Sequence, residues 1–205
     1  SDESSKYRTP PTQWRIASHD ATESGTNLLT NILGEKRFTF PKSLYAVLDT
    51  IRFFVANKPN AIVLDFFAGS GTTAHAVNLL NADDNGNRQC IMVTNHEVSD
   101  TEAKKLSKAG YQPGDIEWES LGIARYVTWP RTVCSIEGKD SKSNSIDGNC
   151  YGGGYDISKG FEPNVAYFKL GFLNKDEVAF GRQFKELVPV LWMTSGGKGS
   201  CPVTA

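Results

Sequence analysis

An apolar run that leads directly into a glycine-rich turn is the feature that most constrains the fold of this sequence. The run covers residues 61–67, and its β-branched and aromatic residues are typical of a parallel strand buried on both faces. The turn 68–73 reads Ala-Gly-Ser-Gly-Thr-Thr and opens a helix that is expected to continue to about Leu80. A second apolar run follows at 89–94, so strand, helix and strand predict a βαβ unit and an α/β fold.

Helical periodicity on both sides of this unit predicts flanking helices. Apolar residues recur at steps of three and four after Ser43, and Gly34 is typical of a helix end. We therefore expect helices at 27–33, 44–55, 101–109 and 176–193, and helical segments over 118–136 that are broken or kinked at Pro130. A third strand is expected at 165–170, which makes the predicted sheet parallel but partial.

Three polar stretches interrupt or flank the expected folded part, residues 25–193. Residues 1–24 combine a Pro-Pro pair with scattered charge, which predicts an extended arm. Residues 138–163 are rich in glycine, serine, asparagine and aspartate, and a loop of this composition buries too little apolar surface to order itself. Residues 194–205 are expected to form a flexible tail.

Composition excludes some classes of protein. No apolar run approaches the roughly 20 residues of a membrane span, and the polar first residues do not resemble a signal peptide. The cysteines have no close spacing, which argues against a metal site and indicates a reducing, cytoplasmic compartment. The net charge of −1 does not favour a nucleic-acid partner, and basic pairs such as Arg125 with Arg131 are interpreted as solvated surface.

The glycine-rich turn predicts a ligand site at the carboxyl end of the first strand. A phosphate-binding P-loop is excluded because Gly71 is followed by threonine instead of lysine. The pattern Gly69-x-Gly71-x-x-Ala74 matches a dinucleotide fingerprint, but Asp65 at the strand end would repel a pyrophosphate. A carboxylate there suits a cationic ligand, and S-adenosylmethionine carries an ammonium and a sulfonium. In a third interpretation, the turn only reverses the chain and Asp65 caps the next helix.

Residues 65–73, Asp-Phe-Phe-Ala-Gly-Ser-Gly-Thr-Thr, closely resemble the donor-binding motif of adenine-N6 and cytosine-N4 DNA methyltransferases. Residues 40–44 resemble the segment that opens the preceding helix in the permuted, beta-class subgroup, where the catalytic region comes first and the donor-binding region last. Residues 25–38 are similar to the lead-in of type III modification subunits. The resemblance covers most of 25–193, is strongest at 38–97, and implies a Rossmann-like methyltransferase fold that binds S-adenosylmethionine.

The resemblance also implies roles for individual residues toward the methyl donor. Asp65 would accept from the methionine ammonium, Lys42 and Ser43 would close over the same end, and Glu97 would bind the ribose hydroxyls. Ser43 departs from the family, in which proline is common, and Glu97 can also be read as a solvated loop acid. The remaining residues would line the methionine side with backbone amides and a helix-start hydroxyl: Phe66, Phe67, Ala68, Gly69, Ser70, Gly71 and Thr72.

The family's catalytic tetrapeptide, Asp/Asn/Ser-Pro-Pro-aromatic, is absent from the sequence. The one Pro-Pro pair, at 10–11, lies in the tetrapeptide Thr-Pro-Pro-Thr, which has threonine in place of Asp, Asn or Ser and no base-stacking aromatic at its fourth position. The resemblance therefore implies that the catalytic half lies upstream of Ser1, that this part alone is inactive, and that the longer protein methylates DNA, favouring adenine N6. DNA and, in restriction-modification systems, a restriction subunit would be its partners. A dinucleotide-binding domain and a non-catalytic donor-binding module are the alternatives.

Overall fold

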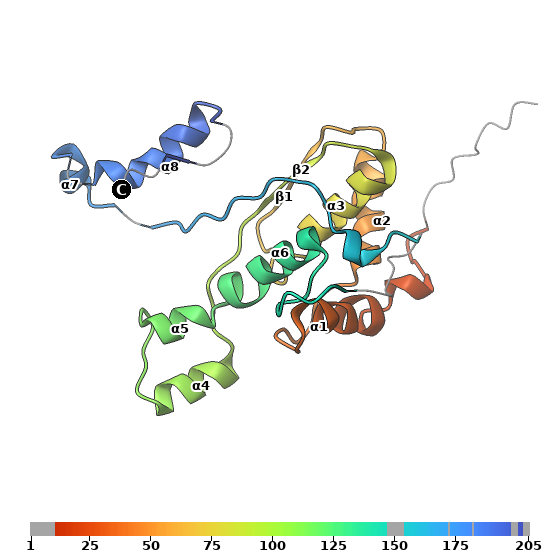
Figure 1. The fold of residues 1–205 in the computed structure, drawn as a ribbon, viewed down its shortest axis with the longest axis horizontal. Helices are drawn as coiled ribbons and strands as arrows, with labels where there is room; N and C mark the ends of the chain where they lie inside the picture. Colours follow the sequence, from red (N-terminus) through yellow and green to blue (C-terminus); the bar gives the residue numbers. More distant parts are fainter. Residues whose placement is uncertain (1–10, 147–153, 172, 182, 198–200, 203–205) are drawn as a thin grey trace, which may run out of the picture. The chain divides into compact units, whose positions relative to one another are not determined.

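The computed structural model describes residues 11–146, 154–171, 173–181, 183–197 and 201–202, which belong to two compact units, Ser1–Asn164 and Val165–Ala205. The first unit contains the short helices η1 (Ala17–His19), η2 (Thr22–Asn27), η3 (Ala124–Thr128) and η4 (Ile157–Lys159). Its α-helices and strands are α1 (Leu28–Leu33), α2 (Leu44–Val55), β1 (Ile62–Asp65), α3 (Thr72–Asp84), β2 (Gln89–Met92), α4 (Asp100–Lys108), α5 (Ile116–Ser120) and α6 (Trp129–Glu137) (Figure 1). The second unit contains α7 (Lys175–Ala179) and α8 (Phe184–Thr194).

The predicted βαβ unit is confirmed. Strands β1 and β2 form a two-stranded parallel sheet in which Ile62 is opposite Gln89 and Asp65 is opposite Met92. Helix α3 connects them and packs against both α2 and β2 (Figure 1). The chain therefore has an α/β fold in which the carboxyl ends of both strands meet at one edge of the sheet.

The prediction that both faces of the strands are buried is wrong for the described residues. Val63 and Cys90 are half-buried against the core, whereas Ile62, Leu64 and Ile91 are 64%, 50% and 50% exposed. Alternate residues of a strand point to opposite faces, and α3 covers only one of them. The other face consequently remains an apolar surface.

Helix α2 forms where the sequence predicts it. Ser43 is its N-cap, and the Ser43 hydroxyl accepts a hydrogen bond from the Ala46 N–H at 3.4 Å. Its buried positions Leu44, Leu48 and Ile51 follow the helical repeat and give it one apolar face. Helix α1 ends, as predicted, at Gly34, which has a left-handed φ of 71°.

The core lies among α1, α2, α3 and α6, and the 138–163 segment contributes to it. Ile146, Ile157 and Phe161 are each less than 9% exposed, and the Phe161 N–H donates to the Ile136 carbonyl at 2.8 Å. The expectation that this segment cannot order itself is therefore wrong for its described parts, because a few apolar residues anchor it. Residues 147–153 of the expected loop lie outside the described residues.

The region before α1 is not simply an extended arm. Residues 22–27 form the π-helical turn η2, and Ser24 within it is buried. His19 bonds to Asp49 of α2, with 2.8 Å between Nε2 and Oδ2, so this region is tied to the helix core. Residues 1–10 of the expected arm lie outside the described residues.

The second unit differs from its predicted secondary structure. Residues 165–170 form no strand, because no described strand of this unit lies beside them to supply a hydrogen-bond partner. The single helix expected at 176–193 is divided into α7 and α8, with Gly181 between them at a left-handed φ of 72°. Helix α8 continues to Thr194, and residues 198–200 and 203–205 of the expected tail lie outside the described residues.

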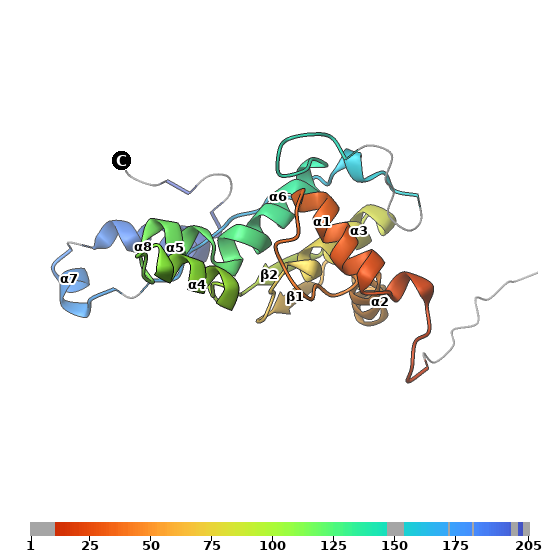
Figure 2. The same cartoon turned by 90° about the horizontal axis from the view of Figure 1, so that it is seen from below.

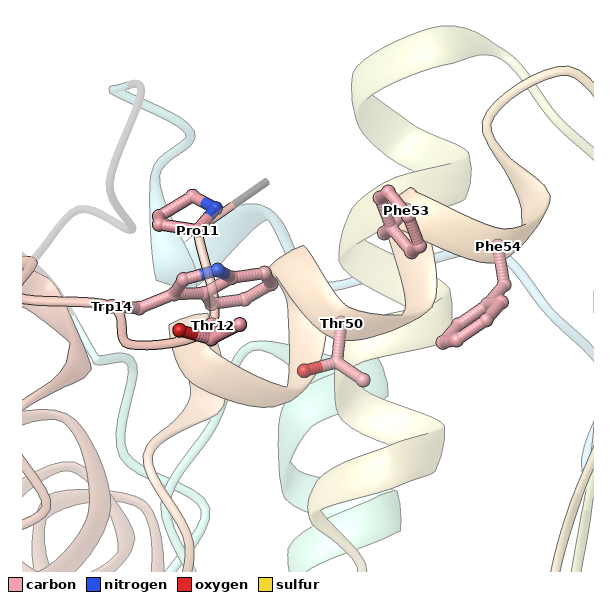
Figure 3. Close-up of a pocket in the computed structure, with 6 residues that line it drawn as sticks. All are labelled: Pro11, Thr12, Trp14, Thr50, Phe53 and Phe54. Carbon is pink, nitrogen blue, oxygen red and sulfur yellow. The ribbon is translucent and has the colours of Figure 1, made fainter. Parts of the chain in front are cut away.

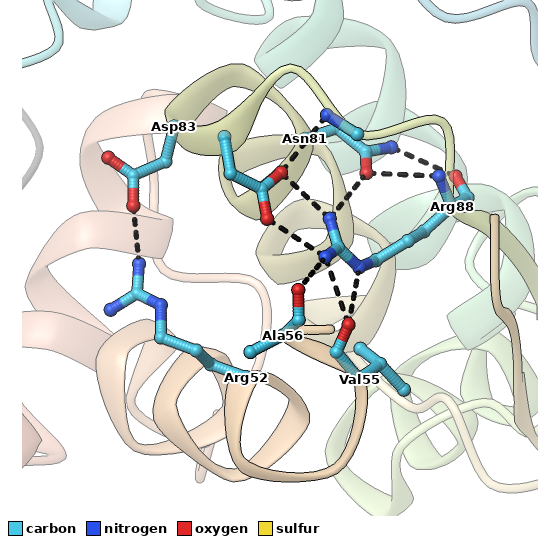
Figure 4. Close-up of polar contacts among 8 residues, drawn as sticks. Arg52, Val55, Ala56, Asn81, Asp83 and Arg88 are labelled. Atoms are coloured by element: carbon cyan, nitrogen blue, oxygen red, sulfur yellow. Dashed lines mark hydrogen bonds and ion pairs between the residues drawn. The ribbon is translucent and has the colours of Figure 1, made fainter. Parts of the chain in front are cut away.

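Arg88 joins the ends of two core helices. Its side chain is fully buried, and its guanidinium donates to the carbonyls of Val55 and Ala56 at the end of α2 at 2.9–3.2 Å (Figure 4). The same group forms a two-bond ion pair with Asp84 of α3 at 2.8 Å. Arg52 forms a second ion pair between the helices, with Asp83 at 2.7 Å, but these two side chains are 41% and 61% exposed.

Helices α4 and α5 lie side by side (Figure 2). Helix α4 corresponds to the predicted charged helix, and Ser99 caps it by accepting from the Glu102 N–H at 3.3 Å. Across the described parts of the chain, none of the helices has the length and apolarity required to cross a membrane.

Candidate functional site

The predicted turn lies at the carboxyl edge of the sheet and is fastened to the end of β2. The Val93 N–H donates to the Asp65 carbonyl at 2.7 Å, and the Ala68 N–H donates to the Val93 carbonyl at 3.1 Å. This edge is where open α/β sheets bind their ligands.

Both glycines of the turn have the conformation that their presence predicts. Gly69 and Gly71 have left-handed φ angles of 48° and 77°, which side chains with a Cβ rarely adopt. The Gly71 N–H donates to the Ala68 carbonyl at 2.7 Å and closes the turn. Gly71 is also the N-cap of α3, and it has no side chain with which to cap the helix.

Asp65 uses its carboxylate to organise the turn. One oxygen accepts from the Phe67 N–H at 3.0 Å, and the other accepts from the Thr73 hydroxyl at 2.5 Å. The interpretation in which Asp65 supports the start of the helix therefore describes part of its role. A carboxylate has about four lone-pair sites, so two such bonds leave capacity for a ligand.

The residues predicted to line the donor divide into two groups by burial. The Phe66 and Phe67 side chains face solvent, at 62% and 94% exposed, whereas Ala68 and Ser70 are buried. The ring of Phe38 lies close to Gly69, 3.6 Å from the position a Cβ would take there. Aromatic rings therefore lie next to the turn, while its residues Ala68 and Ser70 are buried in the protein interior.

The other predicted site residues are held in different ways. The Ser43 hydroxyl donates to the Ser18 carbonyl at 3.1 Å, while Lys42 is exposed. Thr72 is buried and its hydroxyl accepts from Arg131 at 2.7 Å, so this hydroxyl faces the protein interior. Glu97 is exposed, accepts from the Asn95 amide at 3.0 Å, and lies further from β2 than expected because the strand ends at Met92.

Two residues behind the turn were missed by sequence reasoning. The Thr128 hydroxyl donates to the Gly69 carbonyl at 2.5 Å, and Arg131 Nη1 donates to Ser70 Oγ at 3.2 Å. Arg131 is 0% exposed, so its interpretation as solvated surface is wrong. Only their spacing on one helical face was visible in the sequence, and that spacing does not reveal what the face contacts.

Two titratable groups close to the site are perturbed by burial. Burial lowers the pKa of His75 well below 6.5, and the charge of Arg131 lowers it further. Burial raises the pKa of the Cys90 thiol to about 12, and the Asp65 charge contributes to that rise. Both groups are therefore uncharged at neutral pH.

A shallow pocket elsewhere on the first unit does not involve the turn. It is lined by Pro11, Thr12, Trp14, Thr50, Phe53 and Phe54, between the segment before η1 and the outer side of α2 (Figure 3). None of these residues belongs to the predicted donor site. No group of three or more potential metal ligands occurs among the described His, Cys, Asp and Glu residues.

Comparisons with known proteins agree with the resemblance seen in the sequence. The chain is 45% identical over 91 residues to the type II methyltransferase M.KpnI of Klebsiella pneumoniae, a segment that covers 44% of this chain and 21% of that protein. It is 40% identical over 92 residues to the type III EcoPI Mod subunit of Escherichia phage P1, covering 45% of this chain and 14% of the subunit. The StyLTI Mod subunit of Salmonella typhimurium is 38% identical over 97 residues, covering 46% and 14%.

A family model described as DNA methylase, for N6 and N4 methyltransferases, matches residues 2–146. This match extends over more than half of the 205 residues and includes the strand, the glycine turn and helix α6. The chain therefore belongs to the N6/N4 DNA methylase family.

Proposed function

We propose that this chain is the S-adenosylmethionine-binding part of a site-specific DNA methyltransferase that modifies adenine at N6 in a restriction-modification system. The observation that carries the proposal is the turn between β1 and α3, where the Asp65 carboxylate and two left-handed glycines lie at the carboxyl edge of a parallel sheet. The similarity to type II and type III modification enzymes supports the DNA methyltransferase assignment.

The residues of the turn fit the charges of the proposed ligand. Asp65 supplies negative charge with unused lone pairs, which suits the methionine ammonium. Helix α3 begins after an N-cap that offers no side-chain hydrogen bond, so its first N–H groups and positive dipole end suit a carboxylate. S-adenosylmethionine supplies an activated methyl group on its sulfonium, and the chain's own residues bind and orient it.

The remaining roles are part of the same proposal. Residues 66–72 would line the methionine end, Lys42 and Ser43 would approach from the start of α2, and Glu97 would hold the ribose hydroxyls. Residues 25–193 would form the donor-binding part of a Rossmann-like domain that acts on DNA in the cytoplasm. A catalytic region, and in type III systems a restriction subunit, would be the partners.

Dinucleotide binding is disfavoured by the position of Asp65. Its carboxylate accepts from the Thr73 hydroxyl in the first turn of α3, which is where a pyrophosphate would be expected to bind. A pyrophosphate would bring only negative charge next to Asp65, whereas the methionine end of S-adenosylmethionine brings an ammonium together with its carboxylate. The proposal therefore predicts that S-adenosylmethionine binds and NAD does not.

Calorimetric titration of the chain with S-adenosylmethionine, S-adenosylhomocysteine and NAD tests the proposal. Asp65→Asn keeps an oxygen for the Phe67 N–H but removes the charge, and we expect donor affinity to fall by about 1.5–3 kcal/mol, as for a charge-assisted hydrogen bond. Asp156→Asn is the matched control, because Asp156 makes a similar local bond to the Ser158 N–H at 2.9 Å at the separate turn η4.

Unchanged affinity in Asp65→Asn, or preference of the wild-type chain for NAD, would contradict the assignment. A transfer assay with tritiated S-adenosylmethionine and DNA addresses the second part of the proposal. We expect no methyl transfer by this chain alone, because it has no Asp/Asn/Ser-Pro-Pro-aromatic tetrapeptide. Transfer above background would show that the chain holds a catalytic centre of a different kind.

A further inference from the structure

One face of the helical segment that ends in α6 lies directly behind the glycine turn. Thr128, Arg131 and Thr132 are three and four residues apart, so they lie on one side of the helix. All three are buried, at 6%, 0% and 5% exposed. A Cβ on Gly71 would lie 3.3 Å from the Thr128 methyl group, so the turn backbone packs closely on this face.

Two of these side chains donate to consecutive carbonyls of the turn. The Thr128 hydroxyl has one proton, and the Gly69 carbonyl at 2.5 Å is nearer to it than the Ile123 carbonyl at 3.2 Å. Arg131 Nη1 lies 3.4 Å from the Ser70 carbonyl. The same Nη1 donates to the Ser70 and Thr72 hydroxyl oxygens at 3.2 and 2.7 Å.

These bonds determine which way the turn presents its N–H groups. In a trans peptide the C=O and the N–H point in opposite directions, and no described peptide bond is cis. Because the Gly69 carbonyl points at Thr128, the Ser70 N–H of the same peptide points away from Thr128. Among the described residues none accepts a hydrogen bond from that N–H, whereas the Gly71 N–H is used within the turn.

We propose that Thr128 and Arg131 are positioning residues of the donor site, which hold the 69–71 peptides so that the Ser70 N–H faces the ligand. The proposal rests on the proposed function, since it takes S-adenosylmethionine as the ligand of the turn. The buried guanidinium of Arg131 also places a positive charge behind the turn. That charge favours an anionic group on the ligand side, and the methionine carboxylate is such a group.

A set of threonine variants in the full chain tests the role of Thr128. Thr128→Val removes the hydroxyl and keeps the shape, and we expect S-adenosylmethionine affinity to fall roughly fivefold, as for one net hydrogen bond. Thr128→Ser restores the hydroxyl and should restore affinity. Thr132→Val is the matched control, because the Thr132 hydroxyl donates to the Thr128 carbonyl within the helix at 2.8 Å and not to the turn.

Amide NMR of the ligand-free variants gives a second readout that does not depend on the donor. Thr128→Val should shift the Ser70 amide resonance, whereas Thr132→Val and Thr128→Ser should leave it close to its wild-type position. Arg131→Lys, which keeps the charge, should bind the donor more tightly than Arg131→Met. If Arg131→Met fails to fold, the variants at Thr128 and Thr132 alone test the positioning role.

The outcomes separate the two proposals. A wild-type chain that does not bind S-adenosylmethionine would overturn the proposed function. A wild-type chain that binds it, together with equal affinity and equal Ser70 resonances in Thr128→Val and Thr132→Val, would overturn the positioning role alone. Weaker binding in Thr128→Val with rescue by Thr128→Ser would support the positioning role.

Discussion

Replacing Arg88 by methionine should destabilise the protein far more than the same replacement at Arg52. Both arginines link α2 to α3 through an ion pair, with Asp84 and Asp83 respectively (Figure 4). The Arg88 side chain is 0% exposed and also serves the last carbonyls of α2, whereas the Arg52 side chain is 41% exposed. The two variants therefore make the same chemical change in two different dielectric environments.

The expected losses of stability follow from how deeply each ion pair is buried. Removing one partner of a buried ion pair costs about 3–5 kcal/mol, because the remaining charge loses its compensation. The Asp84 side chain is 35% exposed and keeps some contact with water, which places the expected loss for Arg88→Met near the lower end, about 3 kcal/mol. Arg52 makes two partly exposed pairs, with Asp83 and with Asp49. Such pairs contribute a few tenths of a kcal/mol each, so the expected loss for Arg52→Met is about 1 kcal/mol.

Urea unfolding followed by far-UV circular dichroism measures both losses at neutral pH. Arg88→Lys keeps the charge but loses the planar set of donors, so its stability should lie between that of the wild type and that of Arg88→Met. Equal losses in Arg88→Met and Arg52→Met would refute the reasoning, because they would show that burial does not determine the strength of this link.

Two further predictions concern titratable groups near the turn. The folded-state pKa of His75 is lowered, so on acidification the unfolded state binds a proton before the folded state does. The contribution of His75 to stability is therefore complete above pH 6.5. At lower pH the stability should decrease by about 1.4 kcal/mol per pH unit until the folded-state pKa is reached. Urea midpoints at several pH values measure this slope, and His75→Gln should remove the part of the pH dependence that comes from His75. The Cys90 thiol, with a pKa raised to about 12, should react with iodoacetamide far more slowly in the folded chain than in urea. Peptide mapping by mass spectrometry reports that rate, and equal rates in both states would contradict the burial of this thiol.

Local sequence patterns determined where the helices α1 and α2 and the glycine-rich turn lie in the chain. The helical repeat of α2 and the glycine that ends α1 depend only on residues a few positions apart, and both were predicted correctly. Gly69 and Gly71 have left-handed φ angles, a conformation that glycine adopts readily and residues with a Cβ rarely adopt. The family motif at 65–73 then indicated which ligand class such a turn binds.

Only the tertiary structure decided which residues support that turn and which surfaces are covered. Arg131 contacts Ser70, 61 positions away in the chain, and Arg88 contacts Val55, 33 positions away. No pattern among neighbouring residues could therefore indicate that these two arginine side chains are buried. The apolar strand residues looked alike in sequence, yet Val63 packs inward while Leu64 is half exposed. The hydrophobicity of a side chain determines how much free energy its burial would contribute, whereas the presence of a helix over one face of a strand depends on the path of the whole chain.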